Sequence, residues 1–427
     1  MKLSNTSVPP SAAPAAAKRR AAPKTTTSAA TSAAAPAPAS SAAYGKQGLP
    51  LLGGLTAKAF MKTYWQKMPL LIKQAAPHYI DRFPVDDLFE LAGDDDVESR
   101  LVTQRRGRWQ LTRGPLDEDV RDTLGATNWS LLVQGVNLYD DDADALLREF
   151  RFIPAARLDD LMISYAVDGG GVGPHFDSYD VFLLQTHGRR RWRISDQRDL
   201  SLDADQPMKI LKSFTPTQEW VLEPGDMLYL PPHIAHEGVA LGDCITCSIG
   251  FRAPTEREMT AQFLHAMAEK LERDTGEDLR YQDPDQPAVT RSAALPEGLT
   301  TTTQRLIDAM QWERTDIVQF LGGYLTEPKA HVFFDSPLRT LKRDTFVKRL
   351  LARGLHLDNR TRMLHDKRAV FINGECIVHN DRGEQELLKK LADERCLDGK
   401  EVVTLAHHSA IVSLWYEWYL AGWIHVA

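Results

Sequence analysis

The chain has 427 residues, of which 43% are hydrophobic and 26% are charged. This composition is typical of a globular protein of two or three domains, and no apolar run is long enough to span a membrane. The net charge of −7 argues against a protein that coats nucleic acid with its whole surface, and four cysteines are too few for a disulfide scaffold, which suggests a reducing compartment.

Residues 1–44 consist mostly of Ala, Pro, Ser and Thr. Such a segment cannot bury enough apolar surface to offset the entropy of ordering it, so we expect a disordered tail. A mitochondrial transit peptide is the alternative, because the first acidic residue of the chain is Asp81. Against it, the basic residues are few and clumped, and the prolines would break an amphipathic helix.

The next segments predict a helix followed by a β-rich region. Phe60, Tyr64 and Trp65 have helical spacing before Pro69, which predicts a helix that packs against a core. From Leu161 onward, short apolar runs alternate with Gly and Pro turns, and a tight hairpin is predicted at His187. This pattern favours an antiparallel barrel or double-sheet roll. The runs are 161–167, 180–185, 189–194, 220–232 and 244–251.

A histidine and an aspartate lie two positions apart after a glycine-rich turn. On a strand, His175 and Asp177 would point to the same face and offer one nitrogen and one oxygen ligand. A second histidine would complete the two-His-one-carboxylate set that holds Fe(II). His236 leads directly into the next strand, His233 lies in a turn bounded by prolines, and His187 lies at the predicted hairpin. Spacing alone leaves this third ligand open, and a surface pair is the alternative.

The run "RRRWRI" separates into two faces. Arg190, Trp192 and Ile194 form the set that contains the large apolar side chains, so we expect this set to face the barrel interior. A buried guanidinium needs an anionic partner. That partner is either the distal carboxylate of 2-oxoglutarate, as in an iron oxygenase, or an internal Asp or Glu that forms a structural ion pair.

The last predicted strand carries a CxxC pair and two hydroxyl side chains. Cys244 and Cys247 are three residues apart and should point to opposite faces, which disfavours a redox dithiol. Thr246 and Ser248 share one face. Their hydroxyls either lie beside a bound carboxylate or only pack and bond locally.

The rest of the chain predicts helices and then a small α+β domain. Thr255 and Glu258 have capping-box spacing, and a second helical stretch is expected at about 296–324. An apolar stripe on the first helix packs either on the barrel or in a dimer interface; it comprises Met259, Phe263, Met267 and Leu271. Asn373 and Gly374 predict a hairpin. Residues 339–368 carry ten Lys or Arg and three Asp or Glu, which fits a solvated helix face better than a contact with ribosomal RNA.

Several motifs together resemble one family. They are "YWQKMPLLI", "DGGGVGPHFDSYDVFLLQTHGRRRWRI", "LEPGDMLYLPPHIAHEG", "SIGFRAPT" and "YQDPD", and they extend over about 64–285. The chain resembles the ribosomal oxygenases, which are JmjC-type, cupin-fold protein hydroxylases, and among them the arginine hydroxylases of large-subunit ribosomal protein L-sixteen. The resemblance implies an α+β protein with three folded parts, whereas the tail 1–44 has no counterpart in the family. The three parts are a double-stranded β-helix (cupin/JmjC jelly roll) at 45–254, a helical dimerisation segment at 255–328 and a winged-helix-like domain at 329–427.

The resemblance also implies roles for individual residues. His175, Asp177 and His236 would bind Fe(II), and Arg190 would anchor 2-oxoglutarate, with O2 as the second cosubstrate. Asp168 would hold the guanidinium of the substrate arginine, unless it only caps the backbone of its turn. Tyr179 would line the same pocket, unless it packs in the core. The expected protein is a cytoplasmic homodimer that acts on L-sixteen; the alternatives are hydroxylation of histidine or another residue of a ribosomal protein, or a cupin that oxidises a small molecule.

Overall fold

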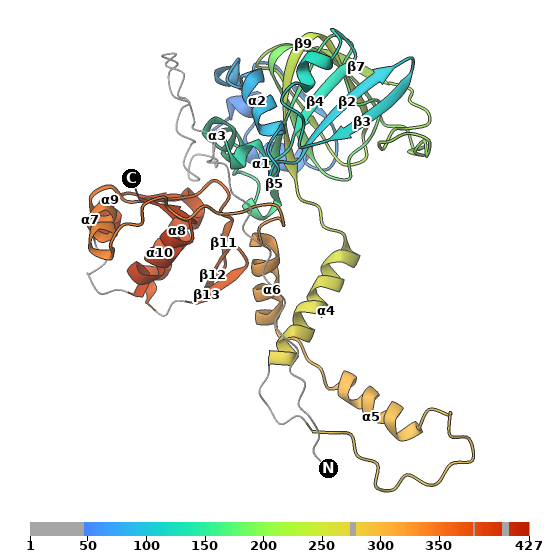
Figure 1. Cartoon of the computed structure of the whole chain (residues 1–427), viewed down its shortest axis with the longest axis vertical. Coiled ribbons are helices and arrows are strands. Elements are labelled where there is room, and N and C mark those ends of the chain that lie inside the picture. The colour runs from blue at the N-terminus through green and yellow to red at the C-terminus, as the bar shows by residue number, and fades with distance from the viewer. Residues whose placement is uncertain (1–46, 274–278, 379–380, 404–409, 427) are drawn as a thin grey trace. The chain divides into compact units, whose positions relative to one another are not determined.

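The computed structural model describes residues 47–273, 279–378, 381–403 and 410–426. The predicted tail, 1–44, lies outside these ranges. Within them, no helix combines the length and the apolar character that crossing a membrane would require. Two folded regions follow one another along the chain, and a helical segment connects them (Figure 1).

The first region is built on a large antiparallel sheet. Its strand order is β1-β8-β6-β9-β5-β4-β2-β3, with β7 paired to β6. The two longest strands, β6 (Val181–Ser195) and β9 (Ala235–Phe251), pair along most of their length. The remaining strands are β1 (Leu70–Ile72), β2 (Ser99–Arg105), β3 (Arg108–Arg113), β4 (Trp129–Val133), β5 (Leu158–Ala166), β7 (Gln218–Leu222) and β8 (Met227–Leu230). The expected antiparallel roll is confirmed.

The predicted hairpin at His187 is wrong, because His187 lies within the continuous strand β6. The sequence signal comes from two register shifts on either side of this residue in the pairing with β9. Gly188 has a φ of +58°, and a Cβ atom there would lie 1.9 Å from the carbonyl oxygen of Asp243. The glycine therefore marks a bulge at which the strand bends rather than a turn that ends it.

Helices cover one side of this sheet and supply its core. Thr56 accepts a hydrogen bond from the Ala59 N–H and caps α1 (Ala57–Thr63). Phe60 is fully buried, and its ring lies 5.0 Å from that of Tyr229; burial of such a side chain stabilises the fold by about 2 kcal/mol. The predicted core helix is thus confirmed, although it ends before Tyr64. The other helices here are α2 (Val85–Ala92) and α3 (Asp141–Arg148), with short 3-10 turns at Pro50–Leu52, Pro77–Tyr79, Val120–Thr123, Val136–Leu138 and Ala155–Arg157.

The connecting segment contains three helices, α4 (Glu256–Arg273), α5 (Glu297–Asp308) and α6 (Arg314–Thr326). The single helical stretch expected at 296–324 is therefore two helices, and Glu313 and Asp316 form a capping box that starts the second. The Phe263 ring packs edge-on against Trp312 and Phe320. Part of the predicted stripe thus packs on α6 and its preceding turn.

The C-terminal region has its own hydrophobic core, centred on the fully buried Trp415. The hairpin predicted at Asn373 and Gly374 is confirmed, since both residues have positive φ between β12 and β13. The elements are α7 (Arg343–Arg353), β10 (Leu355–Leu357), β11 (Met363–His365), β12 (Ala369–Ile372), β13 (Glu375–Val378), α8 (Arg382–Glu394), β14 (Cys396–Leu397), α9 (Gly399–Val403), α10 (Ala410–Leu420) and β15 (Ile424–His425).

Candidate metal centre and its pocket

Three potential metal ligands converge at one end of β9. Single ligand atoms of His175, Asp177 and His236 all lie within 4.8 Å of one another, and no other group of this kind occurs in the described ranges. The two imidazole rings are 4.2 Å apart, and His236 Nε2 lies 3.6 Å from Asp177 Oδ2. Two imidazoles and one carboxylate are the donor set of non-haem Fe(II) centres with open coordination positions.

The other two candidate histidines lie elsewhere. His233 has an exposed side chain, and its contribution is a backbone N–H that donates to the Asp177 carbonyl at 2.8 Å. His187 is exposed and pairs with Asp81 at 2.7 Å. The structure thus brings His236 to the HxD pair, a choice that spacing left open.

The expectation that His175 and Asp177 lie on a strand is wrong. His175 makes one isolated bridge to His236, and residues 176–180 form a loop. Reciprocal backbone hydrogen bonds of 2.9 and 2.8 Å between the two histidines hold the loop against the start of β9. The convergence therefore results from pairing across the chain and not from the alternation of side chains along a strand.

Both imidazoles have the tautomer that a metal ligand needs. Nδ1 of His175 lies 2.9 Å from the Gly173 carbonyl, and Nδ1 of His236 lies 2.9 Å from the Ile234 carbonyl. Because a carbonyl only accepts, each Nδ1 carries the proton and each Nε2 keeps its lone pair. Burial and the nearby His175 lower the pKa of His236, so this imidazole is neutral at pH 7.

The interior face predicted for β6 is confirmed. Arg190, Trp192 and Ile194 are all at least 95% buried, whereas Arg191 and Arg193 on the opposite face are half-buried. Trp192 lies 5.9 Å from the His236 ring, and the Arg190 guanidinium lies 5.9 Å from the Trp192 ring. Trp192 therefore connects Arg190 to the candidate metal ligand His236.

The Arg190 guanidinium lacks an anionic partner among the described residues. Its one hydrogen bond is from Nη1 to the Ser164 hydroxyl at 3.3 Å, while Nε and Nη2 are buried without a partner. A buried cation in this state is costly unless a ligand completes its hydrogen bonds. Ser164 escaped sequence reasoning, because the large apolar side chains Leu161, Ile163 and Tyr165 lie on the opposite face of its strand.

The hydroxyl residues of β9 lie on the same interior face. Thr246 is fully buried and donates to Gln185 Oε1 at 2.9 Å, and Ser248 is 8% exposed. Thr246 pairs across the sheet with Ser164 on β5, which places it next to the residue that holds Arg190. Cys244 and Cys247 are free and pack in different apolar clusters, and burial raises the pKa of Cys247, which keeps the thiol protonated.

The two expected substrate residues are both exposed. Asp168 is exposed, and its Oδ1 accepts the Gly242 N–H at 2.9 Å. Its neighbour Gly169 bonds to Ala240, four residues from His236 on β9, which corresponds to about 13 Å of strand. Tyr179 follows Asp177 in the loop and is 42% exposed, so it does not pack in the core.

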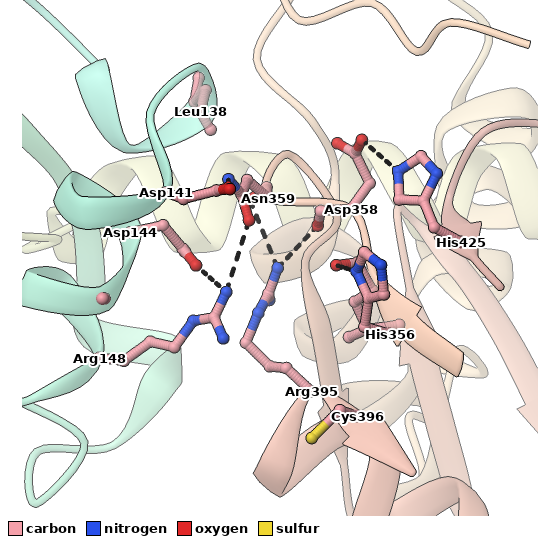
Figure 2. Close-up of a pocket in the computed structure, with 12 residues that line it drawn as sticks. Leu138, Asp141, Asp144, Arg148, His356, Asp358, Asn359, Arg395, Cys396 and His425 are labelled. Carbon is pink, nitrogen blue, oxygen red and sulfur yellow. Dashed lines mark hydrogen bonds and ion pairs between the residues drawn. The ribbon is translucent and has the colours of Figure 1, made fainter. Parts of the chain in front are cut away.

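A cavity of about 410 Å³ lies away from the residues described above. Figure 2 shows its two walls, with Arg148 of α3 facing Arg395, which follows α8. Arg148 pairs with Asp144, and Arg395 donates to backbone carbonyls of Thr361 and Asp358. None of the predicted site residues lines this cavity.

Comparison with known proteins agrees with these observations. Residues 145–259 match the JmjC domain model, and residues 309–425 match the ROXA-like winged helix model. The chain is 39% identical over 272 residues to the ribosomal protein uL16 3-hydroxylase of Escherichia coli, covering 63% of this chain and 71% of that protein. It is 30% identical to a probable ribosomal oxygenase of Haemophilus influenzae, covering 83% and 90% of the two chains.

Solved structures give the same result. The structure of the Escherichia coli ribosomal oxygenase YcfD in complex with cobalt and 2-oxoglutarate has a TM-score of 0.73 and 32% identity. The match covers 89% of this chain and 99% of that one. A second structure of the same protein has a TM-score of 0.75 at 33% identity, covering 87% and 98% of the two chains. The resemblance and the fold class are confirmed: the chain belongs to the ribosomal oxygenase family, with a JmjC domain and a ROXA-like winged helix.

Proposed function

We propose that this protein hydroxylates a carbon atom of an arginine side chain in ribosomal protein L-sixteen (uL16), using Fe(II), 2-oxoglutarate and O2. One observation carries the proposal: a two-His-one-carboxylate cluster lies one side chain, Trp192, away from a buried arginine whose guanidinium lacks an anionic partner among the described residues. The E. coli relative named for uL16 hydroxylation, and the complex of its structural neighbour with cobalt and 2-oxoglutarate, support the choice of substrate and cofactors.

The residues present fit these groups. His175, Asp177 and His236 would hold the iron through Nε2 and carboxylate atoms that no backbone group occupies. Arg190 would bind the distal carboxylate of 2-oxoglutarate through Nε and Nη2, and Thr246 and Ser248 would line its binding site. When bound, Fe(II) with 2-oxoglutarate and O2 supplies the oxidising power to insert one oxygen atom into an unactivated C–H bond, with succinate and CO2 as coproducts.

The protein has two tasks in this reaction. The buried side chains of Trp192 and Ile194 would exclude water from the bound 2-oxoglutarate and would strengthen its ion pair with Arg190. Asp168 would accept the guanidinium of the substrate arginine, because the Gly242 N–H fixes Oδ1 and leaves the second carboxylate oxygen for a ligand. An arginine substrate needs such a carboxylate to offset the loss of water around its charge; Tyr179 would line the entrance.

Tandem mass spectrometry tests the proposal. We expect recombinant protein with Fe(II), 2-oxoglutarate and ascorbate to add one oxygen atom to arginine in a uL16 peptide, and we expect Asp168→Ala to impair peptide turnover while 2-oxoglutarate still binds. Matched peptides with histidine or lysine at the target position serve as controls. Oxidation of the histidine peptide alone would overturn the arginine assignment, and consumption of a free small molecule with no peptide oxidised would overturn the protein substrate.

The proposal extends to quaternary structure and location. Large apolar side chains are exposed along α4, α5 and the turn before α6, and a second copy of this chain would cover them; they are Leu264, Leu271, Leu299, Leu306, Ile307, Met310 and Trp312. We therefore propose that the protein is a homodimer and that the two copies meet through residues 255–328. In each copy this segment connects a catalytic domain at 45–254 to a winged-helix domain at 329–427. Because the proposed substrate is a ribosomal protein, we also propose that the protein is cytoplasmic.

A further inference from the structure

A groove of about 210 Å³ lies beside the candidate metal centre, outside the pocket described above. The JmjC region supplies part of its wall, including Tyr179 and Phe251, and the helical segment supplies Glu258 from α4 and Tyr324 from α6. Tyr179 is two residues from Asp177, so the groove begins within about 7 Å of chain from that ligand. The groove is therefore close enough to the centre to receive a neighbouring side chain of a bound polypeptide.

The groove contains two carboxylates, and only one of them is paired with cations. Asp159 is compensated by three cations, Arg252 at 3.7 Å, Lys329 at 3.2 Å and Arg362 at 3.4 Å. Glu258 is exposed and accepts the Tyr324 hydroxyl, and no Lys or Arg lies within ion-pair distance of it in the described part of the chain. Glu258 is therefore the negative charge that the groove presents without a cationic partner.

The remaining walls suit the stem of a long side chain. Phe251 is buried beneath the groove, Pro254 and Leu325 add apolar surface, and Tyr179 exposes an aromatic ring. A Lys or Arg side chain packs its methylene groups on such surfaces and its charge near a carboxylate or an aromatic face. An acidic side chain would instead meet Glu258 and be repelled.

We propose that this groove binds a lysine or arginine side chain of the protein substrate, one to three residues from the hydroxylated residue, and that Glu258 is the specificity-determining residue for it. The inference rests on the proposed function and deepens it. The helical segment then completes the substrate site, in addition to its assigned place in a dimer. An extended peptide advances about 3.3 Å per residue, so one to three residues of substrate cover a distance similar to the roughly 7 Å of chain between Asp177 and Tyr179.

The test compares Glu258→Gln with Glu256→Gln. The first substitution keeps an acceptor for the Tyr324 hydroxyl but removes the charge, whereas Glu256 is an exposed acid in the same first turn that does not line the groove. We expect Glu258→Gln to raise KM for a uL16 peptide about three- to fivefold, as for an exposed ion pair, with KM for 2-oxoglutarate unchanged. The dissociation constant of a fluorescein-labelled peptide, measured by anisotropy with Mn(II) and no O2, should rise equally.

Peptides identify the partner residue. Replacing each Lys or Arg near the target by Gln should weaken binding at one position, and that replacement should have no effect in Glu258→Gln. Equal effects of Glu256→Gln and Glu258→Gln, or no sensitive Lys or Arg position, would overturn the inference and leave the proposed function intact. Failure of the wild-type protein to oxidise any peptide would instead overturn the proposed function.

Discussion

Two largely buried arginines, one in each folded region, have opposite surroundings. In the C-terminal region, Arg360 donates to both carboxylate oxygens of Asp358, at 2.8 and 3.1 Å, and to Asp335 at 2.9 Å. In the JmjC region, Arg190 has the Ser164 hydroxyl as its protein partner and two buried nitrogen atoms without one. The pairs of Arg360 contribute to the stability of the fold, whereas Arg190 costs stability until an anion binds.

The difference shows how a binding site can be recognised before any ligand is present. Folded proteins form hydrogen bonds to nearly all of their buried polar groups. A buried cation without such partners, close to a cluster of candidate metal ligands, therefore indicates a site that binds an anion. Substitutions that remove binding groups should therefore affect activity with little loss of stability, and substitutions at Arg360 should do the reverse. Three predictions test this comparison, and a fourth tests the helical segment that connects the two regions.

The largest effect is expected at the metal cluster. Asp177→Ala removes the carboxylate of the proposed triad, so we expect hydroxylation to fall below detection and Fe(II) binding to weaken strongly. His236→Ala should behave alike, and His233→Ala should retain substantial turnover, since its side chain is exposed away from the cluster. Metal titration and peptide mass spectrometry measure both effects. An inactive His233→Ala variant with active His236→Ala would show that the third ligand is misassigned.

The next largest effect is expected at Arg190. Arg190→Met keeps the stem but removes the guanidinium, and losing a charge-assisted bidentate contact costs about 2 to 4 kcal/mol, or roughly thirty- to a thousandfold in KM for 2-oxoglutarate. The melting temperature should stay the same or rise, because an unsatisfied buried cation is removed. Arg191→Met on the opposite face of β6 is the control. Equal effects of the two substitutions would contradict the interior placement of Arg190.

Arg360→Met should show the reverse pattern. It leaves Asp358 with His425 as a partner, and we expect the free energy of unfolding to fall by about 2 kcal/mol with KM for 2-oxoglutarate unchanged. Burial alone would raise the pKa of Asp358, but hydrogen bonds from His425 and Arg360 outweigh it and hold the pKa below its usual value. A depressed pKa stabilises the fold above about pH 4 and stops doing so as the pH falls further. The gap between wild type and variant in urea unfolding should therefore be complete at pH 7 and shrink below pH 4; a constant gap would exclude the ion pair.

The smallest effect is expected in the helical segment. Leu264 is 53% exposed on α4, next to Phe263, which packs against α6. Leu264→Glu should weaken the proposed dimer about tenfold without unfolding the segment, whereas Phe263→Glu should unfold it. Light scattering over a concentration series, with circular dichroism, separates the two results. A wild-type monomer at micromolar concentration would contradict the dimer.

Sequence patterns correctly predicted the structural features that depend on residues close to one another in the chain. The period of two along β6 placed Arg190, Trp192 and Ile194 inside, and the Asn373-Gly374 turn chemistry gave the hairpin of the C-terminal region. The same reasoning failed at His187, because a bulge and a turn share the signal of a glycine after a polar residue. It also misplaced 175–177 on a strand, since an isolated bridge leaves no periodicity along the chain.

The sequence by itself determined the family, the antiparallel roll and the inward face of β6, because these follow from motifs and from the alternation of side chains along one strand. The family motifs already favoured His236 over His233 as the third ligand, but only the tertiary structure decided that Ser164 holds Arg190 and that Glu258 lies in a groove beside Tyr179. Each of these contacts joins residues tens of positions apart, and the register of strands and the packing of helices fix them. A single sequence contains no local signal for such distances.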